Sequence, residues 1–197
     1  GVPLLIGGDD SLPIPMLEAY GARPRGITIL QIDAHIDWRD EVGGERLGLS
    51  STMRRASEMA HVEAIIQVGQ RGTGSARMQD VADAESWGVA FVPAGEIART
   101  GIGRAIDLIP AGADVVICLD LDALDPSIMP AVIGRTAGGL SYWHVLELVA
   151  GVSERARIAG FDMVEFMPSR DVDGQGATVA AQMLAAVMGI IARQGNG

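Results

Sequence analysis

Residues 27–37 read Ile-Thr-Ile-Leu-Gln-Ile-Asp-Ala-His-Ile-Asp, and this stretch decides the fold. Its first part, residues 27–32, is too uniformly apolar for a sheet that is wet on one face, so it predicts a strand buried on both faces. Its second part places Asp33, His35 and Asp37 directly after that strand. The stretch therefore predicts a buried strand whose carboxyl end carries a cluster of polar, ionisable side chains.

Apolar runs of the same kind recur along the chain, and segments with helical spacing lie between most of them. This alternation predicts an α/β protein with a mainly parallel sheet flanked by helices. The irregular stretches 34–50 and 120–140 follow strands, and ligands bind beyond the carboxyl ends of parallel strands. The expected strands are 1–6, 27–32, 63–68, 89–92, 114–119 and 157–164, and the expected helices are 11–22, 51–60, 75–87, 102–109, 141–154 and 175–193.

The charge balance restricts the possible ligands. The chain has 25 acidic and 15 basic side chains, a net charge of -10, and all of the bases are arginines. The arginines form no basic run, which excludes a nucleic-acid interface as a first choice. Without lysine, Schiff-base chemistry and a phosphate loop ending in Gly-Lys-Ser/Thr are also excluded. An acidic chain of this kind suits a cationic ligand or a metal.

The length of 197 residues and the hydrophobic fraction of 48% predict a single domain, residues 1–197, with a sizeable core. A helix needs roughly 18 to 20 consecutive apolar residues to cross a membrane. Charged residues are expected to interrupt each apolar run of this chain before it reaches that length. We therefore expect no membrane segment.

The single cysteine, Cys118, lies inside an apolar run and predicts a buried thiol, consistent with a cytoplasmic protein. The chain opens directly on an apolar strand, like a piece of a longer protein.

Acidic groups stand after three of the apolar runs, in residues 7–11, 33–37 and 120–126. Buried carboxylates repel one another unless cations are present, because removing a charge from water costs several kcal/mol. For Asp40 and for Asp125, which precedes Pro126, a turn or cap role is the favoured interpretation. The groups taken together predict a metal site.

The spacing within two of these groups supports that prediction. Asp33, His35 and Asp37 lie two residues apart, as do Asp120 and Asp122, and in an extended chain such side chains point the same way. Oxygen ligands with one imidazole suit Mn²⁺ or Mg²⁺, and two such ions about 3.5 to 4 Å apart can share a carboxylate. The spacing therefore predicts one face with five candidate ligands.

Four motifs in chain order resemble the ureohydrolases, the family of arginase, agmatinase, guanidinobutyrase and proclavaminate amidinohydrolase, and most of all its agmatinase-like members. The resemblance covers essentially the whole chain, and family members are longer, which implies a missing N-terminal portion. The second and third motifs, in this order, are the specific ones. The motifs are Gly7-Gly-Asp9, Asp33-Ala-His-Ile-Asp37, Asp120-Leu-Asp-Ala-Leu-Asp-Pro126 and Asp162-Met-Val-Glu-Phe-Met-Pro168.

This resemblance implies a three-layer α/β/α fold with two manganese ions at the carboxyl ends of the strands. It implies hydrolysis of a guanidino C–N bond, which gives urea and an amine. Carried over by position, Asp33 and Asp120 would contact both ions. His35 and Asp122 would contact the second ion, and Asp37 the first.

Two further residues would act on the substrate. Glu165 matches the carboxylate that binds the guanidinium, and a planar cation does require a bidentate acceptor. Asp37 is the candidate for passing a proton to the departing amine. Trp38 could lie against a cation or alkyl chain, or could pack under the loop.

The chain departs from the family pattern at two histidines. Asp10 stands where the family has a metal-binding histidine, so the expected ligand set has six members, which carry five negative charges in total. Leu49 stands where many relatives have a histidine near the substrate. Arg54 and Arg55 could bind a carboxylate on the substrate or be surface cations. His61 and His144 are expected to be structural.

These departures leave an alternative function open. The chain could be a catalytically degenerate paralogue that assembles with an active subunit, or a metal-dependent amidase on the same scaffold. The resemblance also implies a homo-oligomer, a trimer or hexamer, and leaves a hetero-oligomer open. The expected substrate is a small cationic guanidino compound.

Overall fold

The computed structural model describes residues 1–74 and 76–194, and its centre is a single parallel sheet. The strand order is β1-β6-β5-β2-β3-β4, and every neighbouring pair is parallel. This confirms the predicted strands and the buried strand at residues 27–32. Residues 1–6, whose apolar run predicts a second buried strand, instead form an edge strand in which Leu4 and Ile6 are exposed. The strands are β1 (Leu4–Ile6), β2 (Ile27–Ile32), β3 (Val62–Val68), β4 (Ala90–Val92), β5 (Asp114–Asp120) and β6 (Arg157–Val164).

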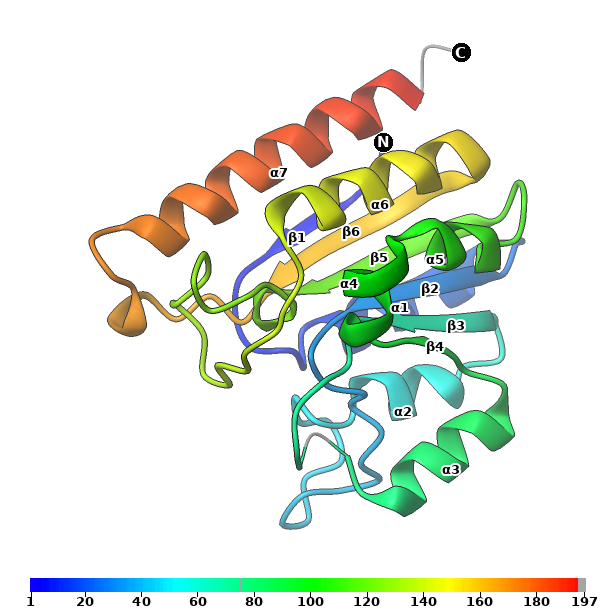
Figure 1. Cartoon of the computed structure of the whole chain (residues 1–197). Coiled ribbons are helices and arrows are strands. Elements are labelled where there is room, and N and C mark those ends of the chain that lie inside the picture. Colours follow the sequence, from blue (N-terminus) through cyan, green and yellow to red (C-terminus); the bar gives the residue numbers. More distant parts are fainter. Residues whose placement is uncertain (75, 195–197) are drawn as a thin grey trace.

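Helices cover both faces of the sheet (Figure 1). The first three helices are α1 (Pro13–Ala19), α2 (Thr52–Ser57) and α3 (Met78–Trp87), and they cover one face. The opposite face is covered by α4 (Ala94–Thr100), α5 (Gly103–Leu108), α6 (Tyr142–Arg155) and α7 (Gln175–Gln194). The fold is therefore the expected three-layer α/β/α arrangement.

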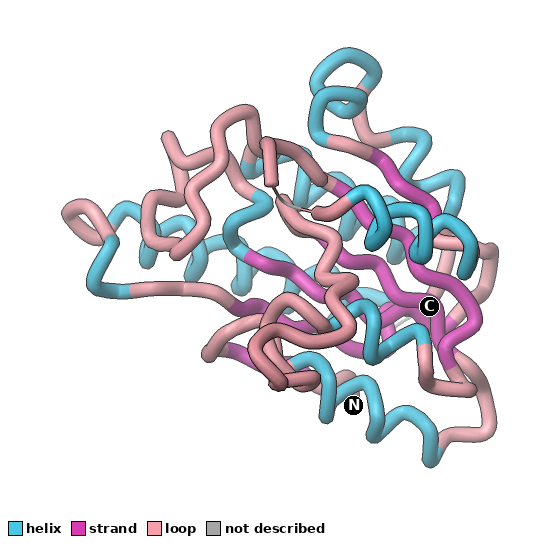
Figure 2. Tube along the Cα trace, turned by 90° about the horizontal axis from the view of Figure 1, so that it is seen from below, coloured by secondary structure: helices cyan, strands magenta, loops and turns pink. Residues whose placement is uncertain are grey.

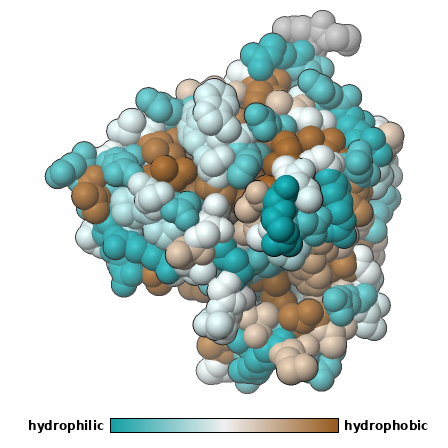
Figure 3. Space-filling view, in the orientation of Figure 1, coloured by the Kyte–Doolittle hydropathy of each residue, from teal (hydrophilic) through white to brown (hydrophobic). Residues whose placement is uncertain are grey.

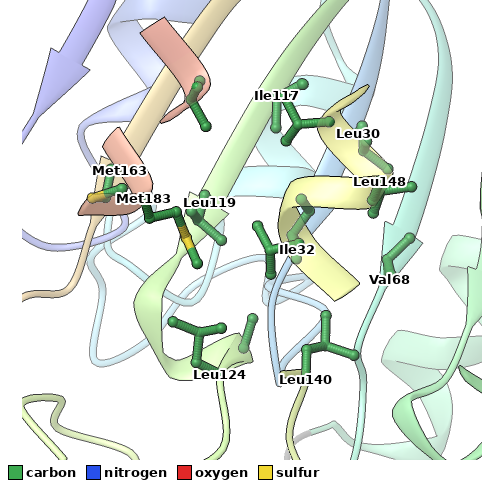
Figure 4. Close-up of a cluster of buried hydrophobic side chains, with 14 of the residues drawn as sticks. Leu30, Ile32, Val68, Ile117, Leu119, Leu124, Leu140, Leu148, Met163 and Met183 are labelled. Carbon is green, nitrogen blue, oxygen red and sulfur yellow. The ribbon is translucent and has the colours of Figure 1, made fainter. Parts of the chain in front are cut away.

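Alternate side chains of β2 explain why the sheet needs two helical layers. Ile29 lies in one buried cluster with Leu17 of α1, whereas Leu30 and Ile32 lie in the other. Figure 4 shows Leu30 and Ile32 beside side chains of β5 and next to Leu148 of α6. A strand with apolar side chains on both faces can be buried only between two layers.

The helices differ from the prediction in two places. Helix α4 was not predicted, because its seven residues lie between Pro93 and Gly101 and are too short to show a helical period. Helix α3 begins at Met78, later than expected, and residue 75 lies outside the described residues. Helix α6 begins as predicted. The Ser141 hydroxyl accepts from the His144 N–H, and His144 Nδ1 accepts from the Ser141 N–H, so His144 is structural.

Helix α7 contradicts the expectation that charges interrupt every apolar run. It is long and apolar enough to cross a bilayer by length and composition, although a soluble core helix can meet the same criterion. Met183, Val187 and Ile190 of this helix are buried in the cluster that also contains α6. Apolar side chains are visible along the band that α6 and α7 occupy (Figure 3). Some of the apolar side chains of α7 therefore pack against α6 and the sheet.

Long loops gather at the carboxyl ends of the strands. They follow β2 and β5, where irregular stretches were predicted, and they account for much of the chain between residues 33 and 51 and between 124 and 141. Figure 2 shows loops in pink, crowded at one end of the magenta strands. These loops form the walls of the candidate site.

Candidate metal centre

Four adjacent strands, β1, β6, β5 and β2, bring carboxylates together at one edge of the sheet. Asp10 follows β1, Asp33 follows β2, Asp120 ends β5 and Glu165 follows β6. All four side chains are buried. Since the carboxyl ends of parallel strands meet at the same edge, residues far apart in the sequence become neighbours here.

The candidate ligand side chains after β2 and β5 lie on two tight turns and not on extended chain. Asp33 Oδ1 accepts from the His35 N–H at 2.6 Å, and Asp120 Oδ1 accepts from the Asp122 N–H at 2.6 Å. Residues Leu121–Ala123 form a short 3-10 helix, η2. The expectation of an extended i, i+2 arrangement is therefore wrong. Aspartate side chains that bond the backbone two residues on bend the chain back on itself.

The ligand atoms fall into two groups that share one residue. Atoms of Asp33, His35 and Asp122 lie within 4.8 Å of one another, and so do atoms of Asp10, Asp33 and Asp120. Asp33 therefore lies between the two groups. Five of the six residues expected from the sequence lie in these two groups.

Asp37, the sixth expected ligand, lies beside the groups. Its Oδ2 accepts from Gln31 Nε2 at 2.7 Å, and the same nitrogen donates to Asp33 Oδ2 at 2.7 Å. Asp37 is buried and has a φ of 45°, an unusual backbone conformation for a non-glycine residue.

Charges within the centre strongly affect one another. His35 Nδ1 lies 3.0 Å from Asp122 Oδ2 and 3.3 Å from Asp33 Oδ1, and these carboxylates raise the pKa of His35 to about 10. Burial, with added repulsion from Asp33, raises the pKa of Asp10 and of Asp120 well above the ordinary value. Asp10 and Asp120 thus resist ionisation, whereas hydrogen bonds from His35 outweigh burial and lower the pKa of Asp33.

The residues present fit a hard divalent cation. Asp10 Oδ2 is buried and has no hydrogen-bond partner among the described residues. A buried carboxylate oxygen without a partner is costly unless a cation binds it. Five carboxylates with one imidazole form the kind of donor set that Mn²⁺ or Mg²⁺ prefers. The buried, unpartnered oxygen of Asp10 is the strongest single indication that these residues bind a cation.

Glu165 connects the end of β6 to the loop after β1. Its Oε1 accepts from the Asp10 N–H at 3.0 Å, and its own N–H donates to the Gly8 carbonyl at 2.9 Å. Its φ is 65°, and burial raises the pKa of its carboxyl. Strained backbone of this kind is often found at functional sites, and here Glu165 and Asp37 share it in one centre.

A cavity of about 300 Å³ opens over the centre. Leu49, at the position where relatives have a histidine, lines its wall together with Ile133. No sequence motif points to two other lining residues, Arg39 and Asp80, whose Nη1 and Oδ2 lie 2.7 Å apart. Asp80 lies in the first turn of α3, so only the tertiary fold brings it to the cavity.

Three polar residues that no sequence motif singles out, Arg71, Gln31 and Gln67, support the centre. Arg71 donates to the carbonyls of Asp122 at 2.7 Å and Thr136 at 2.8 Å, which joins the η2 turn to the cavity loop. Gln31 and Gln67 interrupt otherwise apolar strands. Polar side chains at such positions are a signal that sequence reasoning could have used.

Trp38 contributes to the cavity wall but is 3% exposed, and its ring stacks edge-to-face on that of Trp87 with centroids 6.3 Å apart. Packing under the loop is therefore part of its role, and contact with substrate stays a prediction. Arg54 and Arg55 pair with Glu58 and do not line the cavity. The carboxylate-binding role suggested for these two arginines is therefore not supported.

The remaining residues singled out from the sequence have structural contacts. His61 Nε2 lies 2.8 Å from the Leu17 carbonyl, as expected for a structural histidine. Asp125 accepts from the N–H groups of Ser127, Gly138 and Gly139, and the bonds from Ser127 lead in lowering its pKa to about 2. Its turn role is confirmed.

Fold and site together define an α/β protein with a candidate metal centre of the carboxylate type. The model of the arginase family matches residues 1–189, and the chain belongs to that family. This confirms the resemblance inferred from the four motifs.

Relatives of differing specificity are similar to the chain. The N(1)-aminopropylagmatine ureohydrolase of Thermus thermophilus is 32% identical over 94% of this chain and 61% of its own length. The guanidinobutyrase of Pseudomonas aeruginosa is 27% identical over 98% and 62%. The solved structure of proclavaminate amidino hydrolase from Streptomyces clavuligerus matches with a TM-score of 0.86 and 29% identity, over 98% of this chain and 65% of that one. The chain thus spans less than two thirds of the length of these relatives.

Proposed function

We propose that the protein is a binuclear manganese hydrolase that cleaves a guanidino C–N bond to give urea and an amine, as agmatinases do. The observation that carries the proposal is the pair of ligand groups sharing Asp33, with Glu165 beside them at the cavity floor. Two manganese ions bound together would lower the pKa of a water molecule and so supply the nucleophile. Asp10, Asp33, His35, Asp37, Asp120 and Asp122 would hold the two ions.

Glu165 would bind and orient the guanidinium. Its Oε1 is already fixed by the Asp10 N–H, so the carboxylate plane has little freedom to turn. A fixed carboxylate in a partly enclosed cavity can form two charge-assisted hydrogen bonds with a planar cation. Burial disfavours the ionised form of the Glu165 carboxyl. A bound guanidinium would place a positive charge beside this carboxyl and so favour its ionised form.

Asp37 would move the proton to the departing amine. Its Oδ2 accepts from Gln31, which fixes the plane of the carboxyl group that would take a proton from the attacking water and deliver it to the leaving nitrogen. Burial, followed by repulsion from Asp33, raises the pKa of Asp37, which favours the protonated form of this carboxyl. The overall balance is guanidinium plus water giving urea and an alkylammonium.

The charges around the cavity favour a substrate tail that is cationic. Among the described residues that line it, Arg39 is the one permanent cation, and Asp80 lies 2.7 Å from its guanidinium. A substrate carboxylate would therefore compete with Asp80 for Arg39. Carboxylates elsewhere in the cavity would repel it, whereas an amine would be attracted. This supports an agmatine-like amine in preference to a guanidino acid.

A urea-release assay in the presence of Mn²⁺ tests the proposal. Agmatine, 1-butylguanidine and 4-guanidinobutyrate share one alkyl length and differ in the charge of the tail. The expected order of kcat/KM is amine, then neutral tail, then carboxylate. No urea from any of the three would overturn the proposed hydrolase, and the reverse order would overturn the proposed tail. Release of ammonia without urea would select an amidase.

A second function, a partner subunit without activity of its own, is favoured by Leu49. This side chain is 42% exposed and lines the cavity where relatives carry a histidine. Its apolar side chain cannot transfer protons. The same urea assay decides between the two functions when the protein is tested alone and together with an active family member. No activity of the protein alone, together with co-elution of the two chains as a hetero-oligomer and a changed kcat/KM of the active member, would support the partner role.

A further inference from the structure

We propose that Gln31 and Gln67 form an amide relay that positions two of the candidate metal ligands, Asp33 and Asp37. Neither glutamine lines the cavity, and both are buried, with exposures of 1% and 0%. They are positioning residues, because they would act on the ions only through the two carboxylates. The inference rests on the proposed function, since it assigns a role within that metal centre.

The relay is defined by an unbroken series of hydrogen bonds. Gln67 Nε2 donates to the Ile36 carbonyl at 2.8 Å and also to Gln31 Oε1. Gln31 Nε2 then donates to Asp33 Oδ2 and Asp37 Oδ2, both at 2.7 Å. Gln31 and Gln67 are register partners on β2 and β3, so the sheet itself holds the two side chains level.

The orientation of both amides follows from what their partners can do. The Ile36 carbonyl can only accept a hydrogen bond, so the Gln67 amide must present its NH₂ group to it. The Gln31 oxygen then accepts from Gln67, which leaves the NH₂ group of Gln31 to face the carboxylates. An amide nitrogen has two hydrogens, and Gln31 uses them on two different aspartates. No flip of Gln31 alone preserves these bonds.

This arrangement solves an electrostatic problem of the centre. Asp33 Oδ2 and Asp37 Oδ2 both lie 2.7 Å from the same Gln31 nitrogen, so the two carboxylates are close neighbours and like charges on them repel. A neutral amide that donates to both holds them side by side without adding charge to a site that already has five carboxylates. It also occupies one oxygen of each, so each carboxylate presents its other oxygen to the centre. Such outer contacts usually affect metal affinity strongly.

The relay also fixes the backbone of the loop that carries the ligands. Ile36 precedes Asp37, whose φ of 45° is unfavourable for a non-glycine residue. The bond from Gln67 to the Ile36 carbonyl ties this strained segment to β3. Thus one end of the relay holds the Asp37 backbone and the other holds its side chain.

Titration calorimetry of metal-free protein with Mn²⁺ tests the relay in Gln31→Met, Gln67→Met and the double variant. Methionine keeps the volume and removes the donors and acceptors. We expect Gln31→Met to weaken Mn²⁺ binding about 10- to 100-fold. Gln67→Met should weaken Mn²⁺ binding less. If Gln31→Met does not fold, the Mn²⁺ affinity of Gln67→Met still tests the relay. In the double variant Gln67→Met should add almost nothing, because Gln67 acts through Gln31.

Thr28→Val is the matched control, since Thr28 is a buried polar residue of the same strand that lies away from the cavity. It should leave Mn²⁺ affinity unchanged. Wild-type affinity in folded Gln31→Met, or fully additive losses in the double variant, would overturn the relay while leaving the proposed function intact. Failure of the unsubstituted protein to bind Mn²⁺ would overturn both.

Discussion

The backbone N–H of Asp10 donates to Glu165 Oε1 at 3.0 Å, across 155 residues of sequence. One partner is a candidate metal ligand, and the other is the proposed anchor of the guanidinium. The bond forms because β1 and β6 are neighbours and parallel, so the loops that follow them meet. The candidate metal centre and the proposed substrate site therefore share one contact between two strand ends.

Glu165→Gln should separate substrate binding from metal binding. The glutamine oxygen can still accept from the Asp10 N–H, but the guanidinium loses its negatively charged partner. Since hydrogen bonds to charged groups contribute roughly 1.5 to 3 kcal/mol, kcat/KM for agmatine should fall about 10- to 100-fold or more. Urea release measures this loss, and metal analysis should still find the wild-type manganese content. Loss of manganese, or unchanged kcat/KM, would contradict the assigned role.

Asp10→Ala should remove one manganese equivalent, whereas Asp10→His should retain both. The backbone carbonyl of Asp10 is held by the Thr52 hydroxyl, so removal of the side chain leaves the loop in place. Histidine restores the residue type that the family resemblance implies at this position. Metal content after desalting, measured by elemental analysis, distinguishes the variants. Asp9→Ala is the control, because the exposed Asp9 side chain bonds to Ser11 and lies outside both ligand groups. Equal metal content in all three would exclude Asp10 as a ligand.

Asp80→Asn should shift the tail preference toward carboxylates. Arg39 would lose its charged partner and become available to a substrate carboxylate. We expect the ratio of kcat/KM for 4-guanidinobutyrate to that for agmatine to rise about tenfold, which is about 1.4 kcal/mol of discrimination. Asp83→Asn provides a control on the same helix, since Asp83 bonds to Gln79 and does not line the cavity. An unchanged ratio would show that the Arg39–Asp80 pair does not select the tail.

Asp162→Asn should remove part of the pH dependence of stability in metal-free protein. Asp162 is fully buried on β6, and burial raises its pKa to about 7. The folded state therefore holds a proton that the unfolded state releases near pH 4. The stabilisation from this proton is complete below about pH 4 and is lost as the pH rises toward 7, at most about 1.4 kcal/mol per pH unit.

Denaturant unfolding at several pH values between 4.5 and 8 measures this effect. The variant should match or fall below wild type at the acid end and gain on it as the pH rises. Other buried carboxylates titrate in both proteins, so the difference between the two curves reports Asp162. Parallel curves would contradict a raised pKa at this position.

Local sequence predicts most of the strands of the fold and some of the residues of the candidate site. Residues 27–32 predict a buried strand because every side chain there is compatible with burial, whichever face it takes. Asp33 and Asp120 are recognisable as site residues because each stands where an apolar run ends, which is where buried backbone meets the mouth of a parallel sheet. These signals need only neighbours in the chain.

The rest was decided by tertiary structure. The i, i+2 spacing selected Asp33 and His35, which the fold does bring together, but it predicted the wrong geometry, because the His35 N–H donates to the Asp33 side chain and bends the chain. Asp80 reaches the cavity only through the placement of α3, and Gln31 finds its two aspartates only because the chain folds back over β2. Sequence patterns encode burial and turn chemistry, which act over a few residues. Which groups finally meet depends on the order of strands in the sheet, and a contact across 155 residues leaves no periodic trace in the sequence.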